Sequence, residues 1–221
     1  MARIVITGAN RGIGLALARA YVARGDEVVA AVRVTSADLD ALGAEVHEGV
    51  ELTDDAAVQR FADSLGENSV DVLIANAGIA TSETLEDLNW DRIRRQFEVN
   101  TLGPLRITRA MLPRLKEGAK VAIVTSRSGS IGDNGSGGAY GYRMSKAAVN
   151  MAGVGLALDL EPRGIAVMLL HPGMVKTDML GNVPGGVEPE DAAARMVARI
   201  DDMTLEATGK FIHAEGHELP W

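Results

Sequence analysis

The feature that most constrains the fold lies at the start of the chain. A short apolar segment at residues 3–7 runs directly into the glycine-rich turn TGANRGIG at residues 7–14, and a helix-forming stretch at residues 15–23 follows. A buried strand, a glycine-rich turn and a helix in this order are the local context of a nucleotide-binding turn. The chain is therefore predicted to begin with the first unit of an α/β fold that binds a nucleotide.

Three glycines in this turn have separate expected roles. Gly8 would permit the tight turn, Gly12 would let the backbone approach a pyrophosphate, and Gly14 would let the helix pack close to the strand. The helix N-terminus would then face the phosphates. The spacing is G-x-x-x-G-x-G. The alternative is a glycine turn that binds no ligand.

The rest of the chain continues the alternation of strands and helices. Further strands are expected at residues 27–32, 46–52, 70–74, 120–125, 165–170 and 210–213. Helical stretches are expected at residues 36–43, 53–65, 89–116, 142–160 and 189–200. Alternating strands and helices predict a parallel sheet, here of seven strands, with helices on both faces. We find no repeat, linker or second domain, so residues 1–221 are expected to form a single domain.

Composition excludes several kinds of partner. The net charge of −8 without a Lys/Arg cluster argues against nucleic acid. Cysteine is absent, which excludes disulfides and thiolate metal sites, and we expect no metal. No signal peptide precedes the first strand and no apolar run is long enough to span a membrane, so we expect a cytoplasmic protein without membrane contact.

Tyr142 and Lys146 form a candidate acid–base pair. They lie four residues apart in a helix-forming stretch, so both side chains leave the same face of the helix. A phenol has a reference pKa of about 10, and a nearby ammonium is expected to lower it. Such a pair can give a proton to a carbonyl oxygen or take one from an alcohol. Taken alone, the spacing is also that of an ordinary contact on a helix surface.

Two arginines suggest which dinucleotide is bound. In dinucleotide folds, the end of the second strand carries an acidic residue that accepts from the ribose hydroxyls. Val32 and Arg33 stand there instead, and Arg11 lies within the glycine turn. Two guanidinium groups near the adenosine ribose suit a 2′-phosphate. The alternative is that both are solvated surface arginines.

Three further polar residues are candidate site residues. The fourth strand ends in residues 75–78, where small side chains would leave room beside an adenine ring, and Asn76 in this segment could alternatively be a structural turn residue. Asn100 falls inside a helical stretch that Gly103 and Pro104 follow, a locally unfavourable arrangement that often marks a functional site. Ser126 ends the fifth strand, at the edge of the sheet where ligands bind.

Together these motifs resemble the short-chain dehydrogenases/reductases. TGANRGIG, NAG, VNTLGP, Ser126, YRMSK and PGMVKT occur in the family's order over nearly the whole chain. The segment around Tyr142 and the tail ending in Pro220-Trp221 resemble the compact carbonyl-reductase-like branch that includes the sniffer and C-factor proteins. The resemblance implies a single Rossmann-type, doubly wound domain with the substrate site at the C-terminal ends of the strands.

The resemblance also implies four catalytic residues. Tyr142 would be the general acid in reduction and the base in oxidation, and Lys146 would bind the nicotinamide ribose and lower the pKa of Tyr142. Ser126 would hydrogen-bond the substrate carbonyl. Asn100 would hold, through its main chain, a water that links Lys146 to solvent. The gap from Ser126 to Tyr142 is longer than usual in the family, so Ser128 and Ser130 remain rivals for the serine role.

The implied cofactor is NADP(H), with Thr177 and the backbone near Val175 holding the carboxamide. The full set of implied cofactor-binding residues is Gly8, Asn10, Arg11, Gly12, Ile13, Gly14, Arg33, Leu52, Asn76, Ala77, Gly78, Tyr142, Lys146, Pro172, Gly173, Val175 and Thr177. In two departures from the family, Ala75 replaces the first of two asparagines, and Glu51 replaces an aspartate at the adenine edge.

The expected function is hydride transfer from NADPH to an aldehyde, ketone or quinone-like carbonyl. One alternative is a cofactor-binding signalling or sensor protein with little turnover. The other is an NAD-dependent alcohol dehydrogenase, against which Arg33 argues. The apolar, small-residue face of the Tyr142 helix (Ala147, Ala148, Met151 and Gly155) can bury against the sheet or against another subunit. We expect a homodimer or homotetramer, and a monomer is the alternative.

Overall fold

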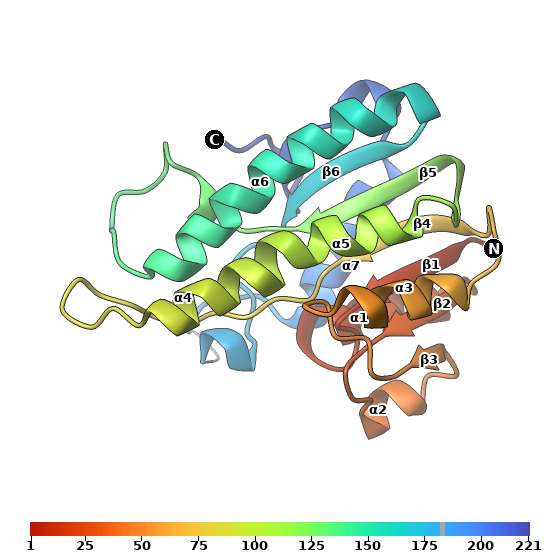
Figure 1. Cartoon of the computed structure of the whole chain (residues 1–221), viewed down its shortest axis with the longest axis horizontal. Coiled ribbons are helices and arrows are strands. Elements are labelled where there is room, and N and C mark those ends of the chain that lie inside the picture. Colours follow the sequence, from red (N-terminus) through yellow and green to blue (C-terminus); the bar gives the residue numbers. More distant parts are fainter. Residues whose placement is uncertain (182–183) are drawn as a thin grey trace.

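The chain folds into a seven-stranded parallel sheet covered by helices on both faces, as the sequence predicted (Figure 1). The computed structural model describes residues 1–181 and 184–221. Within these residues no helix is both long and apolar enough to cross a bilayer.

Seven strands form the sheet, in the spatial order β3-β2-β1-β4-β5-β6-β7. They are β1 (Arg3–Thr7), β2 (Glu27–Ala31), β3 (Glu45–His47), β4 (Val70–Ala75), β5 (Leu115–Val124), β6 (Ala166–His171) and β7 (Phe211–His213). The α-helices are α1 (Gly12–Ala23), α2 (Ala37–Asp40), α3 (Asp55–Asp63), α4 (Trp90–Phe97), α5 (Gly103–Met111), α6 (Tyr140–Leu160) and α7 (Pro189–Asp201). A π-helical turn, η1 (Glu98–Leu102), joins α4 to α5.

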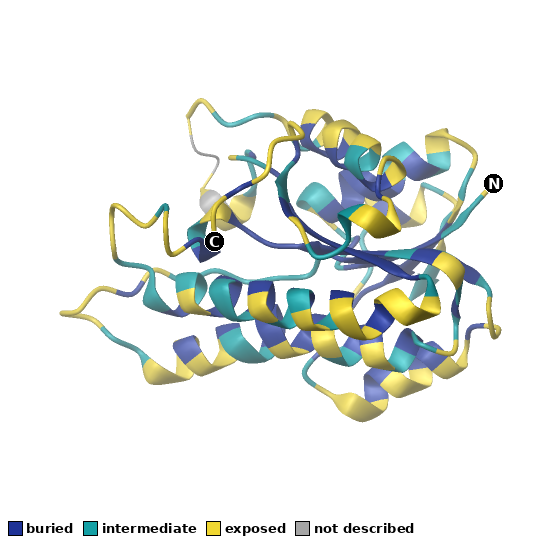
Figure 2. Ribbon diagram, turned by 90° about the horizontal axis from the view of Figure 1, so that it is seen from above, coloured by how far each residue is buried: buried dark blue, intermediate teal, exposed yellow. Residues whose placement is uncertain are grey.

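The helices form two layers, and Figure 2 shows the buried sheet between them. One hydrophobic core lies between the sheet and helices α3, α5 and α6, and includes Phe61, Ile107 and Val149. The second lies between the sheet and helices α1 and α7, and includes Tyr21 and Met196. Because both faces of every central strand are buried, these strands read as continuous apolar runs rather than alternating ones.

The strand order places a crevice at one point of the sheet. The chain proceeds outward from β1 through β2 to β3, and then returns to pair β4 on the other side of β1. At such a reversal the connections after β1 and β4 leave in opposite directions, which opens a binding crevice at the C-terminal ends of the strands. The glycine turn follows β1 and Asn76 follows β4, so both predicted segments meet there.

Two expected elements end five residues earlier than predicted. The third strand covers Glu45–His47 rather than residues 46–52, because Gly49 turns the chain with a φ of 72°. The long helix expected to reach Lys116 ends at Met111, and Leu115 already pairs with Val70 in the sheet. Pro113 explains this ending, since the residue before a proline is disfavoured in helical conformation.

Candidate active site

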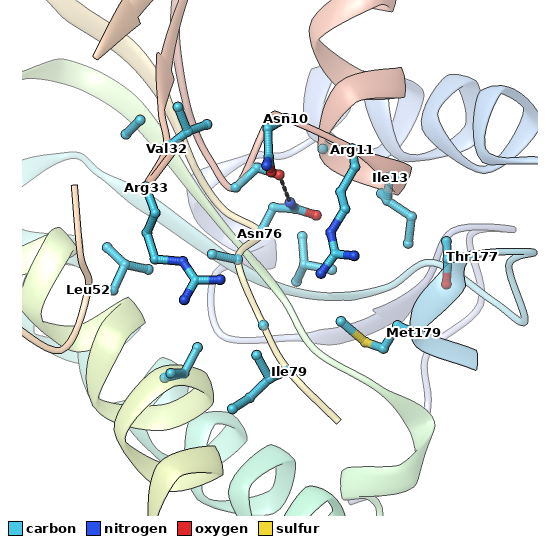
Figure 3. A pocket seen from close by; sticks show the side chains of 18 of the residues that line it. Asn10, Arg11, Ile13, Val32, Arg33, Leu52, Asn76, Ile79, Thr177 and Met179 are labelled. Carbon is cyan, nitrogen blue, oxygen red and sulfur yellow. Dashed lines mark hydrogen bonds between the residues drawn. The ribbon is translucent and has the colours of Figure 1, made fainter. Parts of the chain in front are cut away.

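A groove of about 700 Å³ follows the C-terminal ends of β1, β2 and β4 and reaches the helix that carries Tyr142. Figure 3 shows its side chains, with Arg11 and Arg33 extending into the pocket and Asn76 lying beneath the glycine turn. Fifteen predicted cofactor-binding residues line it: Gly8, Asn10, Arg11, Gly12, Ile13, Gly14, Arg33, Leu52, Asn76, Ala77, Gly78, Tyr142, Lys146, Pro172 and Thr177.

The glycine turn is packed against the end of β4. Gly8 has a φ of 69°, which favours glycine, and a Cβ on Gly14 would lie 2.2 Å from the Gly8 carbonyl oxygen. The Asn76 side-chain amide donates to the carbonyl oxygens of Thr7 at 3.0 Å and Gly8 at 3.2 Å. The Thr7 hydroxyl accepts the backbone N–H groups of Asn76 and Ala77. Asn76 is therefore a structural turn residue that also lines the groove.

The start of α1 fits a pyrophosphate. Its N-cap residue, Arg11, makes no side-chain capping hydrogen bond, and the first turn of α1 carries no acidic residue. The first N–H groups of a helix lack partners within the helix and attract anions. Gly12 lies beside Thr177, with an ideal Cβ 3.5 Å from the Thr177 methyl carbon. The turn after β6 thus closes over the glycine turn, where a nicotinamide nucleotide would lie.

The adenosine end of the groove carries both positive and negative charge. Arg33 is 59 % exposed, and its Nη1 lies 3.8 Å from Glu51 Oε2. Arg95 lies equally close to the same oxygen, at 3.8 Å, and Arg11 lies 3.8 Å from Asp178. These are loose, solvated contacts, so both groove arginines remain accessible to a phosphate. The sequence did not indicate that Glu51 lies beside Arg33.

Replacing Gly14 with alanine tests the close approach of the turn. We expect Gly14→Ala to lower the free energy of unfolding by about 1–3 kcal/mol through overpacking and to weaken NADPH binding, because the glycine turn must move. Thermal unfolding and NADPH fluorescence titration measure the two effects. Gly66→Ala is the matched control, since its Cβ would lie 3.7 Å from the nearest atom. Normal NADPH affinity in Gly14→Ala would contradict this account of the turn.

The other end of the groove is lined by Tyr142 and Lys146, and Ser126 lies near Tyr142 although it is not among the lining residues. Tyr142 and Lys146 lie on one face of α6, with Lys146 Nζ 5.8 Å from the centre of the Tyr142 ring. The buried Lys146 ammonium donates to the Val124 carbonyl oxygen at 2.9 Å. The Ser126 hydroxyl lies close enough to the Tyr142 phenol to lower its pKa, and it accepts the Ser128 backbone N–H at 3.1 Å.

Of the three candidate serines, this geometry favours Ser126. The Ser130 hydroxyl is buried and accepts the Asp133 backbone N–H at 3.1 Å. Ser128 lies in the short 3₁₀ turn that follows Ser126. Gly129 allows this turn to approach α6, since a Cβ there would lie 2.6 Å from the Lys146 carbonyl carbon.

The pKa shifts of Tyr142 and Lys146 differ from the sequence expectation. Burial raises the pKa of the Tyr142 phenol, and the nearby Ser126 hydroxyl offsets part of that rise. Burial also lowers the pKa of Lys146 to about 8, because the ammonium has lost its hydration. In the protein alone, burial rather than the lysine charge therefore dominates the pKa of the tyrosine.

Asn100 lies in the π-helical turn η1 and is completely buried. Its side-chain amide donates to the Ile79 carbonyl oxygen at 2.8 Å and to the Ser145 hydroxyl at 3.0 Å. Its carbonyl oxygen accepts the Ile79 backbone N–H at 2.8 Å. The side chain thus ties the segment after β4 to α6, and a role in proton transfer stays a prediction that concerns its main chain.

Some groove residues differ from the predicted set. Gly173 and Val175 do not line the groove, and their contacts with a cofactor stay predictions. Groove residues outside the predicted cofactor-binding set are Ala31, Val32, Val34, Val50, Glu51, Ile79, Val99, Val124, Thr125, Asp178 and Met179. Most of these residues follow the C-terminal end of a strand, so the predicted strand ends were the sequence signal that could have located them.

Three potential metal ligands that sequence reasoning did not single out gather on the turn after β7. Ligand atoms of His213, Glu215 and His217 lie within 4.8 Å of one another, and the two imidazole rings stack. Two of these residues already have partners: Glu215 accepts from Arg195 at 2.9 Å, and His213 Nδ1 accepts the Glu215 backbone N–H at 3.1 Å. The expectation that the chain holds no metal stays a prediction.

Comparison with known proteins shows the family to which the chain belongs. A family described as short chain dehydrogenase matches residues 2–187. The chain is 46 % identical to 1-hydroxy-2-glutathionyl-2-methyl-3-butene dehydrogenase of Rhodococcus sp. (strain AD45) over 226 residues, covering 100 % of both. It is 46 % identical to C-signal of Myxococcus xanthus over 167 residues, covering 74 % of this chain and 100 % of C-signal.

Among solved structures, the chain resembles the carbonyl reductase Sniffer of D. melanogaster, with a TM-score of 0.93, 28 % identity and 100 % coverage of both chains. It also resembles an NADPH-bound carbonyl reductase from chicken fatty liver, with a TM-score of 0.92, 29 % identity and coverage of 100 % of this chain and 99 % of that one. The chain therefore belongs to the short-chain dehydrogenase family, with a fold like that of its carbonyl reductases.

Proposed function

We propose that this chain reduces an aldehyde, ketone or quinone-like carbonyl with NADPH, using Tyr142 as the proton donor. The observation that carries the proposal is the pair of Tyr142 and the buried Lys146 on one face of α6, at one end of a groove whose other end carries Arg11 and Arg33. The Ser126 hydroxyl lies close enough to Tyr142 to lower its pKa. The NADPH-bound carbonyl reductase among the structural neighbours supports the same cofactor.

Each of the three residues would have a separate task. The Ser126 hydroxyl donates a hydrogen bond to the substrate carbonyl oxygen and holds it beside the phenol. Tyr142 gives its proton to that oxygen as the carbon becomes tetrahedral, and Lys146 stabilises the phenolate that remains. Bound reduced nicotinamide supplies the hydride that the carbonyl carbon accepts. The product is an alcohol, and Tyr142 regains its proton from solvent.

An activity panel tests this proposal. The purified chain should oxidise NADPH only when an aldehyde, a ketone or a quinone is added, and the product should be the corresponding alcohol or hydroquinone. The same panel without protein corrects for direct reduction by NADPH. If none of the carbonyl classes was reduced while NADPH bound normally, the reductase proposal would be wrong and a sensor role would gain support.

A second candidate function is oxidation of an alcohol. The relative from Rhodococcus, similar over its whole length, is described as a dehydrogenase of a glutathione-linked alcohol. The same three residues suit that direction, because a Tyr142 phenolate can accept the alcohol proton. Incubation with a glutathione-linked primary alcohol and NAD or NADP, with formation of NADH or NADPH followed by absorbance, separates this candidate from the first.

Assembly into a dimer or tetramer remains part of the proposal. The solvent-facing side of α6 carries apolar or small residues at a repeating spacing of four and three: Met144, Ala148, Met151, Gly155 and Leu158. Met151 is 74 % exposed and Leu158 is 66 % exposed. This spacing is the seam pattern of packed helices, and a second copy would bury it by two-fold symmetry.

We expect sedimentation at micromolar concentration to give a species larger than the 23.3 kDa monomer. Met151→Glu should shift it to the monomer, because a carboxylate in the buried seam would lose its hydration. Val34→Glu, a change at another exposed apolar side chain outside α6, is the control and should leave the mass unchanged. A wild-type species at the monomer mass would sink the proposed assembly.

A further inference from the structure

A buried acidic side chain, Glu83, lies close to the start of the helix that carries Tyr142. Glu83 belongs to the segment between β4 and α4 and is only 1 % exposed. Its carboxyl group meets neutral donors: the Thr81 hydroxyl, the Gln96 side-chain amide at 3.4 Å and the Gly141 backbone N–H at 3.3 Å. A buried carboxyl group is costly unless such partners hold it, so its environment is built around it.

Glu83 supplies contacts that α6 lacks from its own sequence. The N-cap residue of α6 is Ala139, which has no capping side chain and a φ of 45°. A non-glycine residue in this conformation is strained and persists only where its surroundings hold it. The Glu83 carbonyl oxygen accepts the Ala139 N–H at 2.8 Å, and the carboxyl group accepts the N–H of Gly141. Glu83 therefore holds the first turn of α6 from a distant part of the chain.

The segment that carries Glu83 is itself fixed to α4. Gln96 is completely buried, and its amide nitrogen donates to the Thr81 hydroxyl at 2.7 Å while its amide oxygen accepts the Thr81 N–H at 3.1 Å. A Cβ on Gly141 would lie 2.2 Å from the Gln96 amide nitrogen, so the two helices meet closely here. Figure 1 shows the starts of α4 and α6 at the same end of the molecule.

The next residue after Gly141 is Tyr142, whose hydroxyl must meet both Ser126 and the substrate. We propose that Glu83 is a positioning residue that fixes the first turn of α6 and thereby the place of the Tyr142 hydroxyl relative to Ser126. The proposal rests on the reductase function proposed above. In this proposal, contacts with a distant segment fix the first turn of α6, rather than a capping residue in the local sequence.

Two variants test the proposal. Glu83→Gln keeps the size of the side chain but replaces one carboxyl oxygen with an NH2 group, which would then face N–H and O–H donors. Glu83→Ala removes both side-chain acceptors. We expect kcat to fall by about 10- to 100-fold, as for a small displacement of a reacting group. NADPH affinity should be unchanged, because the glycine turn lies elsewhere. Glu86→Gln, on an exposed side chain of the same segment, is the matched control and should have wild-type kinetics.

The pH profile separates positioning from simple loss of folded protein. The nearby Ser126 hydroxyl lowers the pKa of Tyr142, so a phenol displaced from Ser126 should titrate at higher pH in the kcat/KM profile. A protein that was only destabilised would have a lower kcat/KM at every pH, without a change in the pKa of the profile. Wild-type kcat and pKa in Glu83→Gln, or a lower kcat/KM without a change in pKa, would overturn the proposal.

Further controls keep the test independent of folding and of the reductase proposal. If the Glu83 variants do not fold, Gly141→Ala, which pushes the helix start away from Gln96, should give the same pattern. If the wild type reduces no carbonyl, the reductase proposal fails by itself. Ultraviolet titration of the Tyr142 phenol, taken as the difference from the matching Tyr142→Phe protein, then measures the same pKa shift without turnover. An unshifted phenol would overturn the positioning role.

Discussion

Tyr142→Phe is expected to lower kcat for carbonyl reduction by about 10²- to 10⁴-fold, the usual contribution of a general acid. The substitution keeps the ring that lies beside Lys146 and removes only the hydroxyl that would give its proton to the substrate. NADPH binding, followed by fluorescence titration, should therefore survive. Steady-state kinetics with the best carbonyl substrate of the panel measure the loss.

Tyr140→Phe is the matched control for this experiment. Tyr140 is the first residue of α6 and lies only two residues before Tyr142. Met144, four residues after it, carries no charge, so Tyr140 has no lysine partner at the spacing of the pair. We expect Tyr140→Phe to retain wild-type kinetics. A fully active Tyr142→Phe protein would show that the acid is another group.

Arg33→Ala is expected to remove most of a preference for NADPH over NADH. A 2′-phosphate carries up to about two negative charges near neutral pH, and charge-assisted hydrogen bonds contribute about 1.5 to 3 kcal/mol each. Because roughly 1.4 kcal/mol is a factor of ten, Arg33 and Arg11 together should favour NADPH by tens- to a thousandfold. The variant should raise KM for NADPH and leave NADH kinetics nearly unchanged.

Glu51 makes this prediction sharper than the sequence alone did. Its carboxylate lies 3.8 Å from both Arg33 and Arg95, but only Arg33 lines the groove. Arg95→Ala is therefore the control, since it removes the same kind of contact with Glu51 and should keep the cofactor preference. Equal use of the two cofactors by the wild type would contradict the prediction. A preference for NADH would instead point to Glu51 as the acceptor of the ribose hydroxyls.

The fold was largely predictable because its signals are local. The strand, glycine turn and helix at the N-terminus and the alternation that follows predicted a seven-stranded parallel sheet, which the structure confirms. Element ends were less predictable: Gly49 shortens β3 and Pro113 ends the helical region. A single glycine or proline sets where an element ends to within one or two residues, and the pattern of apolar residues does not resolve that position.

The candidate site likewise contains some residues that local sequence patterns reveal and others that they do not. The glycine turn, Tyr142 and Lys146 could be found because each lies in a short segment with its own spacing. The pairing of Glu51 with Arg33 and the contact of Glu83 with Gly141 join residues 18 and 58 positions apart. Such contacts depend on where the strands and helices come together, so no local pattern indicates them. The effect of burial on the pKa of Lys146 has the same origin.

The most direct test of the central claim is to follow the hydrogen that is transferred. NADPH carrying deuterium at both positions of nicotinamide C4 is incubated with the protein and an aldehyde, and the alcohol is examined by mass spectrometry. The account predicts an alcohol with a deuterium atom on the former carbonyl carbon, formed far more slowly by the Tyr142→Phe protein. An alcohol without deuterium, or no alcohol from any carbonyl of the panel, would contradict it.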